Sequence, residues 1–175
     1  IGGNLILMDK LINGIKRDYA AVYENFENDI YDALKEALPE LEKYQTLKMV
    51  FPSYTYFPEE IVKGFQSFCR EFAFNYEVVH TIYEEEIKTG EVYINLMEDD
   101  LVVLLGKIKL TKLKVGKDVG IISYNETPWK QFILDGITTI STDFKKMGEM
   151  AAQKVLDNDK SRVEVPFALT LRNSL

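Results

Sequence analysis

The chain has 175 residues and a mass of 20.2 kDa, a length that fits one domain or slightly more. Hydrophobic residues make up 46% and charged residues 28%, which is typical of globular proteins and excludes disordered, collagen-like and coiled-coil chains. The 21 basic and 28 acidic residues give a net charge of −7. DNA repels a surface of that charge, so we do not expect this stretch to bind nucleic acid itself.

The single cysteine and single histidine exclude a disulfide framework and a Cys/His zinc site, so we expect no metal. No apolar run reaches the roughly 18 residues that cross a bilayer, so we expect no membrane contact. The first residues, IGGNLILMD, read as a strand and not as the basic and apolar regions of a signal peptide. Because the sequence starts with Ile and not with Met, we expect a fragment of a longer protein.

Short apolar runs predict strands that are covered on both faces, since the runs are nearly continuous and do not alternate with polar residues. These runs are Leu5–Met8, Leu47–Phe51, Tyr76–Ile82, Val92–Leu96 and Val119–Ser123.

Helical patterns, with apolar residues three and four positions apart, lie between these runs. One covers Phe26–Leu41 with Asn25 as its cap, one follows Pro58, and one follows Asp99 and Asp100. Alternation of strands and helices predicts a three-layer α/β/α fold, in which helices cover both faces of a parallel sheet.

The sequence changes character after Ser123. Residues 124–136 read as a loop because Pro128 and Gly136 interrupt them, and a β-branched run follows. A helix is predicted over residues 144–156, with Thr142 or Asp143 as its cap, and residues 163–172 read as a terminal strand or pair of strands.

Ligands of open α/β sheets bind outside the carboxyl ends of the strands. The polar residues that follow the predicted strands are rich in acceptors for hydroxyl groups, and aromatic rings stand close to them in the sequence, which favours a polyhydroxylated ligand. The polar candidates are Asp9, Ser53, His80, Thr81, Glu98, Asp99, Asn125 and Glu126, and the aromatic ones are Tyr124, Trp129 and Phe144.

Plainer roles compete with these. Asp99 and Asp100 fit helix caps, Trp129 fits a packing anchor, and Cys69 fits the core. His80 has no partners in a triad spacing, and the phosphate-binding patterns GxxxxGK[ST] and GxGxxG are absent from the sequence. We therefore expect no enzyme activity, no catalytic residue and no cofactor.

Three motifs follow one another in the C-terminal third: Asp118–Thr127 as a strand and loop, Ile137–Gly148 as a helix start, and Arg172–Ser174 as the end of the last strand. In this order they resemble the effector domain of lactose-repressor-type transcriptional regulators. Weaker likenesses upstream lie at Ile6–Asp9, Ala21–Leu34 and Val62–Phe72.

This resemblance implies a periplasmic-binding-protein-like fold of type I, represented mainly by its C-terminal lobe. Residues 1–142 would form that lobe, residues 143–158 would be a helix that returns to a missing N-terminal lobe, and residues 159–175 would be terminal strands of the C-terminal lobe. Within this group the chain is most similar to the Bacteroidetes branch of GntR-type regulators, in which a winged helix precedes the effector domain. Some members of that branch control the use of monosaccharides, fucose included.

The resemblance also implies effector contacts at Asp9, Asn125, Glu126, Thr142 and Phe144. Glu98 and Asp99 stand where the family has an Asn-Asp pair. Ile61 stands in place of the family's sugar-binding Arg, and Asn125 in place of the more usual Asp.

The expected function is therefore the sugar-sensing domain of a cytoplasmic transcriptional regulator that forms a homodimer and contacts DNA only through a missing N-terminal domain. The alternative is an extracytoplasmic sugar-binding protein of a transporter. A phospho-receiver domain is disfavoured because Asp9 lacks an acidic neighbour, and His80 and Asn125 stand where such a domain needs Asp and Lys.

Overall fold

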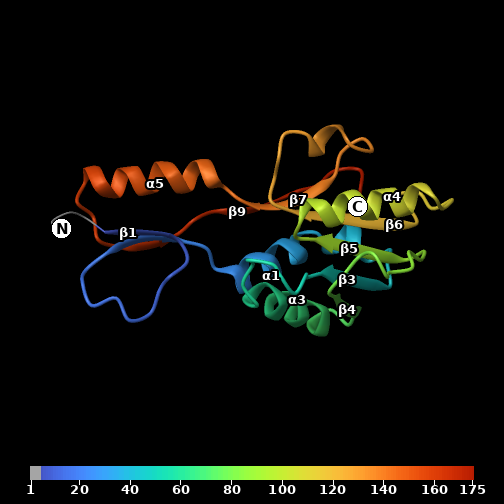
Figure 1. The fold of residues 1–175 in the computed structure, drawn as a ribbon, viewed down its shortest axis with the longest axis horizontal. Coiled ribbons are helices and arrows are strands. Elements are labelled where there is room, and N and C mark those ends of the chain that lie inside the picture. Colours follow the sequence, from blue (N-terminus) through green and yellow to red (C-terminus); the bar gives the residue numbers. More distant parts are fainter. Residues whose placement is uncertain (1–4) are drawn as a thin grey trace. The chain divides into compact units, whose positions relative to one another are not determined.

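The structure, a computed structural model, describes residues 5–175 (Figure 1). Its elements are β1 (Ile6–Asp9), β2 (Ala20–Tyr23), α1 (Phe26–Glu36), α2 (Leu38–Leu41), β3 (Thr46–Val50), α3 (Glu60–Glu71), β4 (Asn75–Val79), β5 (Glu91–Asn95), α4 (Glu98–Lys109), β6 (Val119–Tyr124), the 3-10 helix η1 (Lys130–Phe132), β7 (Thr138–Thr142), α5 (Phe144–Leu156), β8 (Arg162–Glu164) and β9 (Phe167–Thr170).

The chain forms two compact units. The small unit contains the described residues up to Asn25 together with Thr142–Ala168, and the large unit contains Phe26–Ser141 and Leu169–Leu175. The expected block 1–142 is thus divided after Asn25. The reason is strand pairing, since β2 pairs with β1 on one side and with β8 on the other, and neither β1 nor β2 belongs to the sheet of the large unit.

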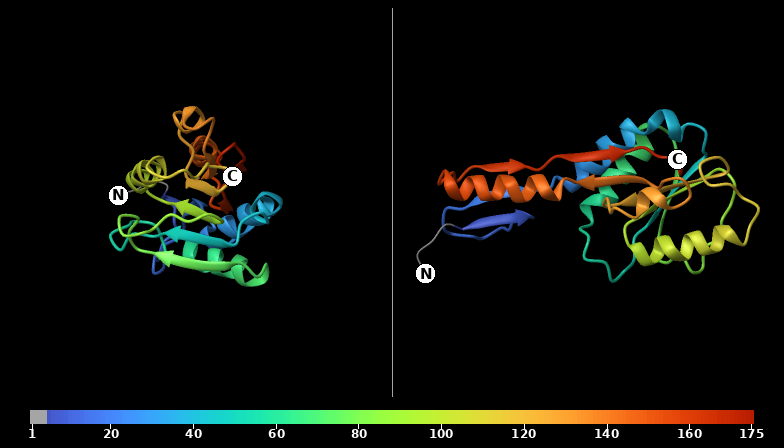
Figure 2. Two further views of the ribbon diagram at one scale, coloured as in Figure 1. Left: turned by 90° about the vertical axis from the view of Figure 1, so that its right-hand side faces the viewer. Right: turned by 90° about the horizontal axis from the view of Figure 1, so that it is seen from above.

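The large unit has the predicted layers. Its sheet runs in the order β4-β3-β5-β6-β7-β9, and the neighbours from β4 to β7 are parallel. Helices α1 and α3 cover one face and α4 covers the other (Figure 2). This confirms the α/β fold class and the covered parallel sheet.

The central strands are buried along their whole length, as their continuous apolar sequences require. Every residue of β5 and β6 is buried. On the face toward α4, Tyr93 and Ile121 pack with Leu101, Leu104 and Ile108 of the helix. This burial on both faces fixes which ends of the strands are free to carry polar residues.

The connection from β4 to β5 departs from strict alternation, because residues 80–90 contain no helix. This connection crosses the sheet over Lys48 of β3, whose ammonium lies 2.7 Å from Glu85 and 3.1 Å from Glu91. Tyr93 also donates to Glu91, at 2.5 Å. A buried polar cluster therefore holds a loop in the place that a helix would otherwise cover.

The small unit is a parallel sheet, β1-β2-β8, with α5 packed on it. Asp143 caps α5 by accepting from the backbone N–H of Lys146 at 2.8 Å, as predicted for one of the two candidate caps. Met147 and Ala151 are buried against Val22. The rest of the apolar stripe is exposed, with Phe144 and Val155 each 52% and Leu156 79% accessible.

Helices α1 and α3 approach closely at Gly64. A Cβ added there would lie 2.1 Å from the carbonyl oxygen of Glu27 and 2.7 Å from Cγ2 of Ile30. Since one contact is backbone, neither helix can accommodate the methyl group without moving.

We predict that Gly64→Ala lowers the free energy of unfolding by about 1–3 kcal/mol, because the overpacking outweighs the better helix propensity of Ala. Gly148→Ala in α5 is the matched control, since a Cβ at this exposed helix position meets nothing within 4 Å. Urea unfolding should show destabilisation for the first variant and a slight gain for the second. Equal stabilities of the two variants would contradict the packing argument.

Candidate functional site

Four of the predicted site residues lie together at the carboxyl edge of the large sheet. Glu98 and Asp99 begin α4 directly after β5, and Asn125 and Glu126 follow β6, its neighbour in the sheet. The parallel register of β5 and β6 brings these two connections to the same edge.

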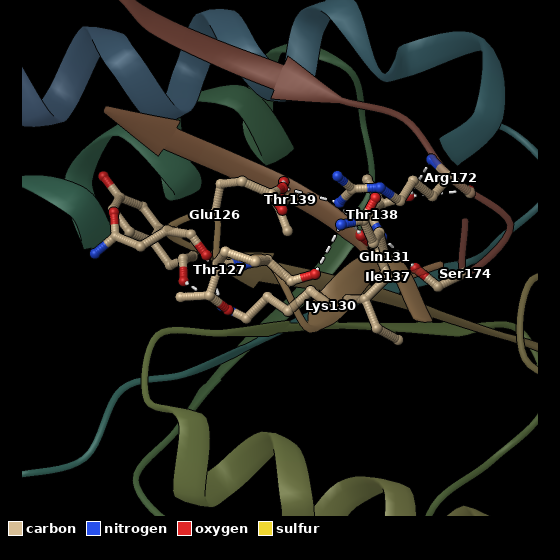
Figure 3. A network of polar contacts seen from close by, with 12 residues as sticks. Glu126, Thr127, Lys130, Gln131, Ile137, Thr138, Thr139, Arg172 and Ser174 are labelled. Atoms are coloured by element: carbon tan, nitrogen blue, oxygen red, sulfur yellow. Dashed lines mark hydrogen bonds and ion pairs between the residues drawn. The ribbon is translucent and has the colours of Figure 1, made fainter. Parts of the chain in front are cut away.

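Lys130, which the sequence analysis did not single out, joins the two connections (Figure 3). Its side chain is 0% exposed, and its ammonium donates to the carbonyl oxygens of Tyr124 at 3.2 Å and Asn125 at 2.6 Å. The same ammonium lies 3.6 Å from Glu98 Oε1. Burial lowers the pKa of Lys130, and the carboxylate of Glu98 opposes this shift. One buried cation thus fixes the loop after β6 against the start of α4.

Asn125 adopts a left-handed backbone conformation, with φ of 64°. Asparagine tolerates this conformation better than most residues, and its N–H donates to the carbonyl of Ile140 at 2.8 Å. Among residues 5–175 the side-chain amide has no hydrogen-bond partner. The backbone of Asn125 is therefore fixed on both sides while its amide can donate and accept.

Glu126 is held by the end of the chain. Its carboxylate accepts from Nη1 of Arg172 at 2.8 Å and from the hydroxyl of Thr139, as Figure 3 shows. Burial raises the pKa of Glu126, but the bonds from Arg172 and Thr139 outweigh it, so the pKa lies below its usual value.

The motif Arg172–Ser174 anchors the tail in the same network. Ser174 donates to the carbonyl of Ile121 and accepts from the N–H of Thr138, each at 2.7 Å. The Thr138 hydroxyl in turn donates to the carbonyl oxygen of Arg172 at 3.0 Å. The motif Arg172–Ser174 therefore has a structural role, since it binds the C-terminal segment to β6 and β7.

Exposed aromatic rings lie in the loop after β3, at the same edge of the sheet. Tyr54 and Tyr56 are 76% and 72% exposed. Phe57 stacks on Tyr56 at 4.6 Å and meets Tyr124 edge-on at 5.3 Å, so the loop is packed against the end of β6. Tyr124 was among the predicted aromatic candidates, whereas Tyr54, Tyr56 and Phe57 were missed, although SYTYF directly after a strand carried the signal.

Three further predicted contacts belong to the small unit. Asp9 ends β1 with φ of 73°, and its carbonyl accepts from Glu24 N–H at 2.9 Å. Thr142 is buried, and Phe144 is the first residue of α5. The N–H of the intervening Asp143 donates to the carbonyl of Pro166, just beyond β8. These residues thus lie at the carboxyl ends of the small sheet.

The remaining candidates make hydrogen bonds within their own loops, are exposed, or belong to the core. His80 Nδ1 lies 2.9 Å from the carbonyl oxygen of Phe51, so the ring bridges two adjacent strand ends. The Thr81 hydroxyl accepts from Tyr83 N–H at 3.3 Å, and Ser53 is exposed. Cys69 is buried in α3 as expected, where burial raises the pKa of its thiol to about 12.

Within residues 5–175, no group of three or more His, Cys, Asp and Glu side chains is arranged to hold a metal ion. None of the helices in the described part of the chain is long and apolar enough to cross a bilayer.

We predict that the contribution of Glu126 to the stability of the fold depends on pH. Its lowered pKa means that the ionised carboxylate stabilises the fold above the unfolded-state pKa, and that this stability is lost as pH falls through the folded-state pKa. The stability gap between wild type and Glu126→Gln should therefore be largest near neutral pH and shrink in acid. Urea unfolding at several pH values measures this gap. In an Arg172→Met background, most of the pH dependence of the gap should disappear. A gap that is constant from neutral pH into acid would show that the ion pair does not act as described.

No family model matches the sequence, and no curated protein sequence matches it. Solved structures do match. A transcription regulator like protein from Staphylococcus haemolyticus has a TM-score of 0.72 and 14% identity, and the alignment covers 98% of this chain and 66% of that one. A LacI family transcriptional regulator from Enterococcus faecalis with bound ribose has a TM-score of 0.72 and 19% identity, and the alignment covers 98% of this chain and 68% of that one.

The dimeric Lac repressor with an 11-residue C-terminal deletion gives a TM-score of 0.75 at 15% identity, covering 97% of this chain and 67% of the repressor. The chain thus spans about two thirds of the length of these proteins. At such identities the likeness concerns the fold: the chain has the periplasmic-binding-protein-like α/β fold of LacI-type regulators.

Proposed function

We propose that the chain is the effector-binding part of a transcriptional regulator, and not an enzyme. The observation that carries the proposal is the amide of Asn125, held at a sheet edge by a fixed backbone yet without a hydrogen-bond partner among the described residues. Ligands of this class of fold bind at that edge. The likeness to LacI-type regulators supports the same function.

The proposed effector contacts in the large unit are Glu98, Asp99, Asn125 and Glu126. The side chain of Glu126 is 34% exposed although it is paired with Arg172. Asp9, Thr142 and Phe144 are the proposed contacts from the small unit. Carboxylate and amide groups accept from hydroxyls, and exposed rings such as Tyr54 and Tyr56 can cover the apolar face of a sugar. We therefore propose a monosaccharide or a derivative of one as effector.

In this proposal the protein acts in the cytoplasm, and its DNA contacts belong to another domain. The GntR-type branch, with a winged helix before the effector domain, is the arrangement that we propose. The sequence of the complete gene product tests it directly: a winged helix upstream supports the proposal, whereas a signal peptide upstream supports a transporter's sugar-binding protein.

We predict that Asn125→Gly weakens effector binding about tenfold or more, because it removes a desolvated hydrogen-bonding group. Glycine accepts a positive φ without strain, so this change separates loss of the amide from loss of the turn. Thermal-shift screening of the intact protein with D-ribose and other neutral monosaccharides identifies a ligand, and calorimetry then gives both affinities. Asn158→Gly is the control, since Asn158 is also an asparagine with a positive φ, 50°, and is not among the proposed contacts. Equal affinity of the Asn125 variant and wild type would remove Asn125 from the site.

We also propose a homodimer that forms through the outer face of α4. The inner face of this helix carries the buried Leu101, Leu104 and Ile108, and its outer face includes Val102, 60% exposed, and the exposed Gly106. An exposed apolar side chain beside a glycine is a feature that a contact between two chains can cover. Beside it lies a hollow of about 730 Å³ lined by Leu105, Gly106, Ile108, Lys109, Thr111, Leu113, Lys114, Val115, Ile133, Leu134 and Asp135.

A second copy fits this face because the hollow carries both charges. Two-fold symmetry places the same patch on both partners, so Lys109 and Lys114 of one copy can meet Asp135 of the other. Gly106 allows close approach, since nothing lies within 4 Å of its added Cβ.

We predict that Gly106→Glu shifts the 175-residue chain toward the monomer, because it buries a charge without a partner at the centre of the interface. Sedimentation velocity measures the change, and circular dichroism checks that the fold is kept. Val155→Glu on α5 is the control, since Val155 is also an apolar helix residue with a large exposed fraction, 52%. If the α5 variant dissociates the dimer and the α4 variant does not, the interface lies on α5.

A further inference from the structure

The small unit carries a concentrated patch of positive charge, although the chain as a whole is acidic. Of the 21 basic and 28 acidic residues, eight of each lie in residues 5–25 and 142–168, so the large unit holds the entire net charge of −7. Within the electrically neutral small unit, Lys16, Arg17, Lys160 and Arg162 line one hollow of about 340 Å³, together with Ile15, Asp18 and Tyr19.

One cation of this hollow, Lys160, belongs to a rigid turn. After α5 the chain turns through Asn158, whose φ is 50°, and Asp159 accepts from both the N–H and the hydroxyl of Ser161 at 2.7 Å. Lys154, which is 7% exposed, donates to Asp159 at 2.8 Å and to the hydroxyl of Ser161 at 2.6 Å. These bonds hold the pKa of Asp159 well below its usual value, so the turn that presents Lys160 keeps its ion pair.

Arg162 is also held in place. Its guanidinium lies 4.2 Å from the centre of the ring of Tyr19, which is 7% exposed, in a cation–π contact. The backbone beside it is fixed by the parallel pairing of β2 with β8, in which Ala21 is opposite Arg162. A guanidinium that is stacked on a ring loses little freedom when it binds an oxyanion.

Asp18 is the acidic residue in the lining of the hollow, and it lies 3.6 Å from Lys160. Lys16, Lys160 and Arg162 share this lining with that one carboxylate, and an anion with several oxygens relieves the repulsion among them by accepting from lysine and arginine together.

We propose that this hollow is a binding site for a phosphoryl group, with Arg162 and Lys160 as its principal ligands and Lys16 and Arg17 as supporting cations. The site lies within the small unit and is separate from the proposed effector contacts at the carboxyl ends of its strands. The phosphoryl group can come from a free phosphorylated metabolite or from the backbone of a nucleic acid, since both present the same oxygens.

The test titrates the 175-residue chain with inorganic phosphate against chloride at constant ionic strength, because screening alone weakens surface electrostatics. Amide NMR shifts should saturate and concentrate at residues 15–19 and 160–162. The double variant Lys160→Gln/Arg162→Gln should weaken binding about tenfold or more. The matched control is Lys145→Gln/Lys146→Gln on α5, which removes the same charge from the same unit and should leave binding unchanged.

A second arm replaces phosphate with a short DNA duplex. Saturable phosphate binding that only the first pair of substitutions weakens supports a small-molecule source. Duplex binding that the same pair weakens, without saturable phosphate binding, supports a polymer source. Shifts that are linear and spread over all lysines, or equal losses in the two double variants, would overturn the proposal.

Discussion

The buried ammonium of Lys130 is the interaction on which the candidate site depends. Its two carbonyl acceptors, Tyr124 and Asn125, are the last residue of β6 and the first residue of the loop. A buried lysine that loses its acceptors carries a large desolvation cost, so the loop cannot leave this conformation without exposing the cation or leaving it unpaired. The left-handed conformation of Asn125 is therefore maintained by the surrounding fold, and not by the preference of that residue alone.

The end of the chain completes the same site from the opposite side. Ser174 and Thr138 join the tail to β6 and β7, and Arg172 then reaches Glu126, the residue after Asn125. The loop is thus held at one position by Lys130 and at the next by Arg172. Two cations from different parts of the sequence thus fix adjacent residues. The Asn125 amide lies between them and has no hydrogen-bond partner among the described residues. Preorganisation of this kind reduces the entropy that a ligand must overcome on binding.

The layers of the large unit could be predicted because strands that are buried on both faces have nearly continuous apolar sequences. The runs at 92–96 and 119–123 coincide with β5 and β6 to within one residue at each end. Strand β2 is absent from the predicted apolar runs because its four residues, AAVY, give too short a run to distinguish from a loop, and only the family likeness at Ala21–Leu34 indicated it. The division after Asn25 was missed for a related reason, since parallel pairing between β2 and β8 joins positions that are 141 residues apart.

The site was predictable only in part, since a sequence shows which residues follow a strand but not where their side chains lie. Asn125 and Glu98 were found by their positions after strands. Lys130 was not, because a lysine in a loop is normally solvated, and only the tertiary structure buries it. Arg172 was recognised in a motif, but its partner Glu126 lies 46 residues away. Long-range ion pairs of this kind follow from the fold and cannot be read from local patterns.

Helix α4 connects two surfaces of the large unit that the proposals assign to different tasks. Its first residue, Glu98, lies beside Lys130 at the candidate site, and its last turn lines the apolar hollow. A rigid helix can couple two such surfaces only if it has two positions that ligand and partner stabilise differently. Glu98 is 50% exposed and is held by one ion pair and one bond from Thr127, whereas Leu101, Leu104 and Ile108 are buried against the sheet. A ligand at the proposed contact Glu98 would therefore meet a residue that few contacts hold, at the start of a helix whose inner face is firmly packed.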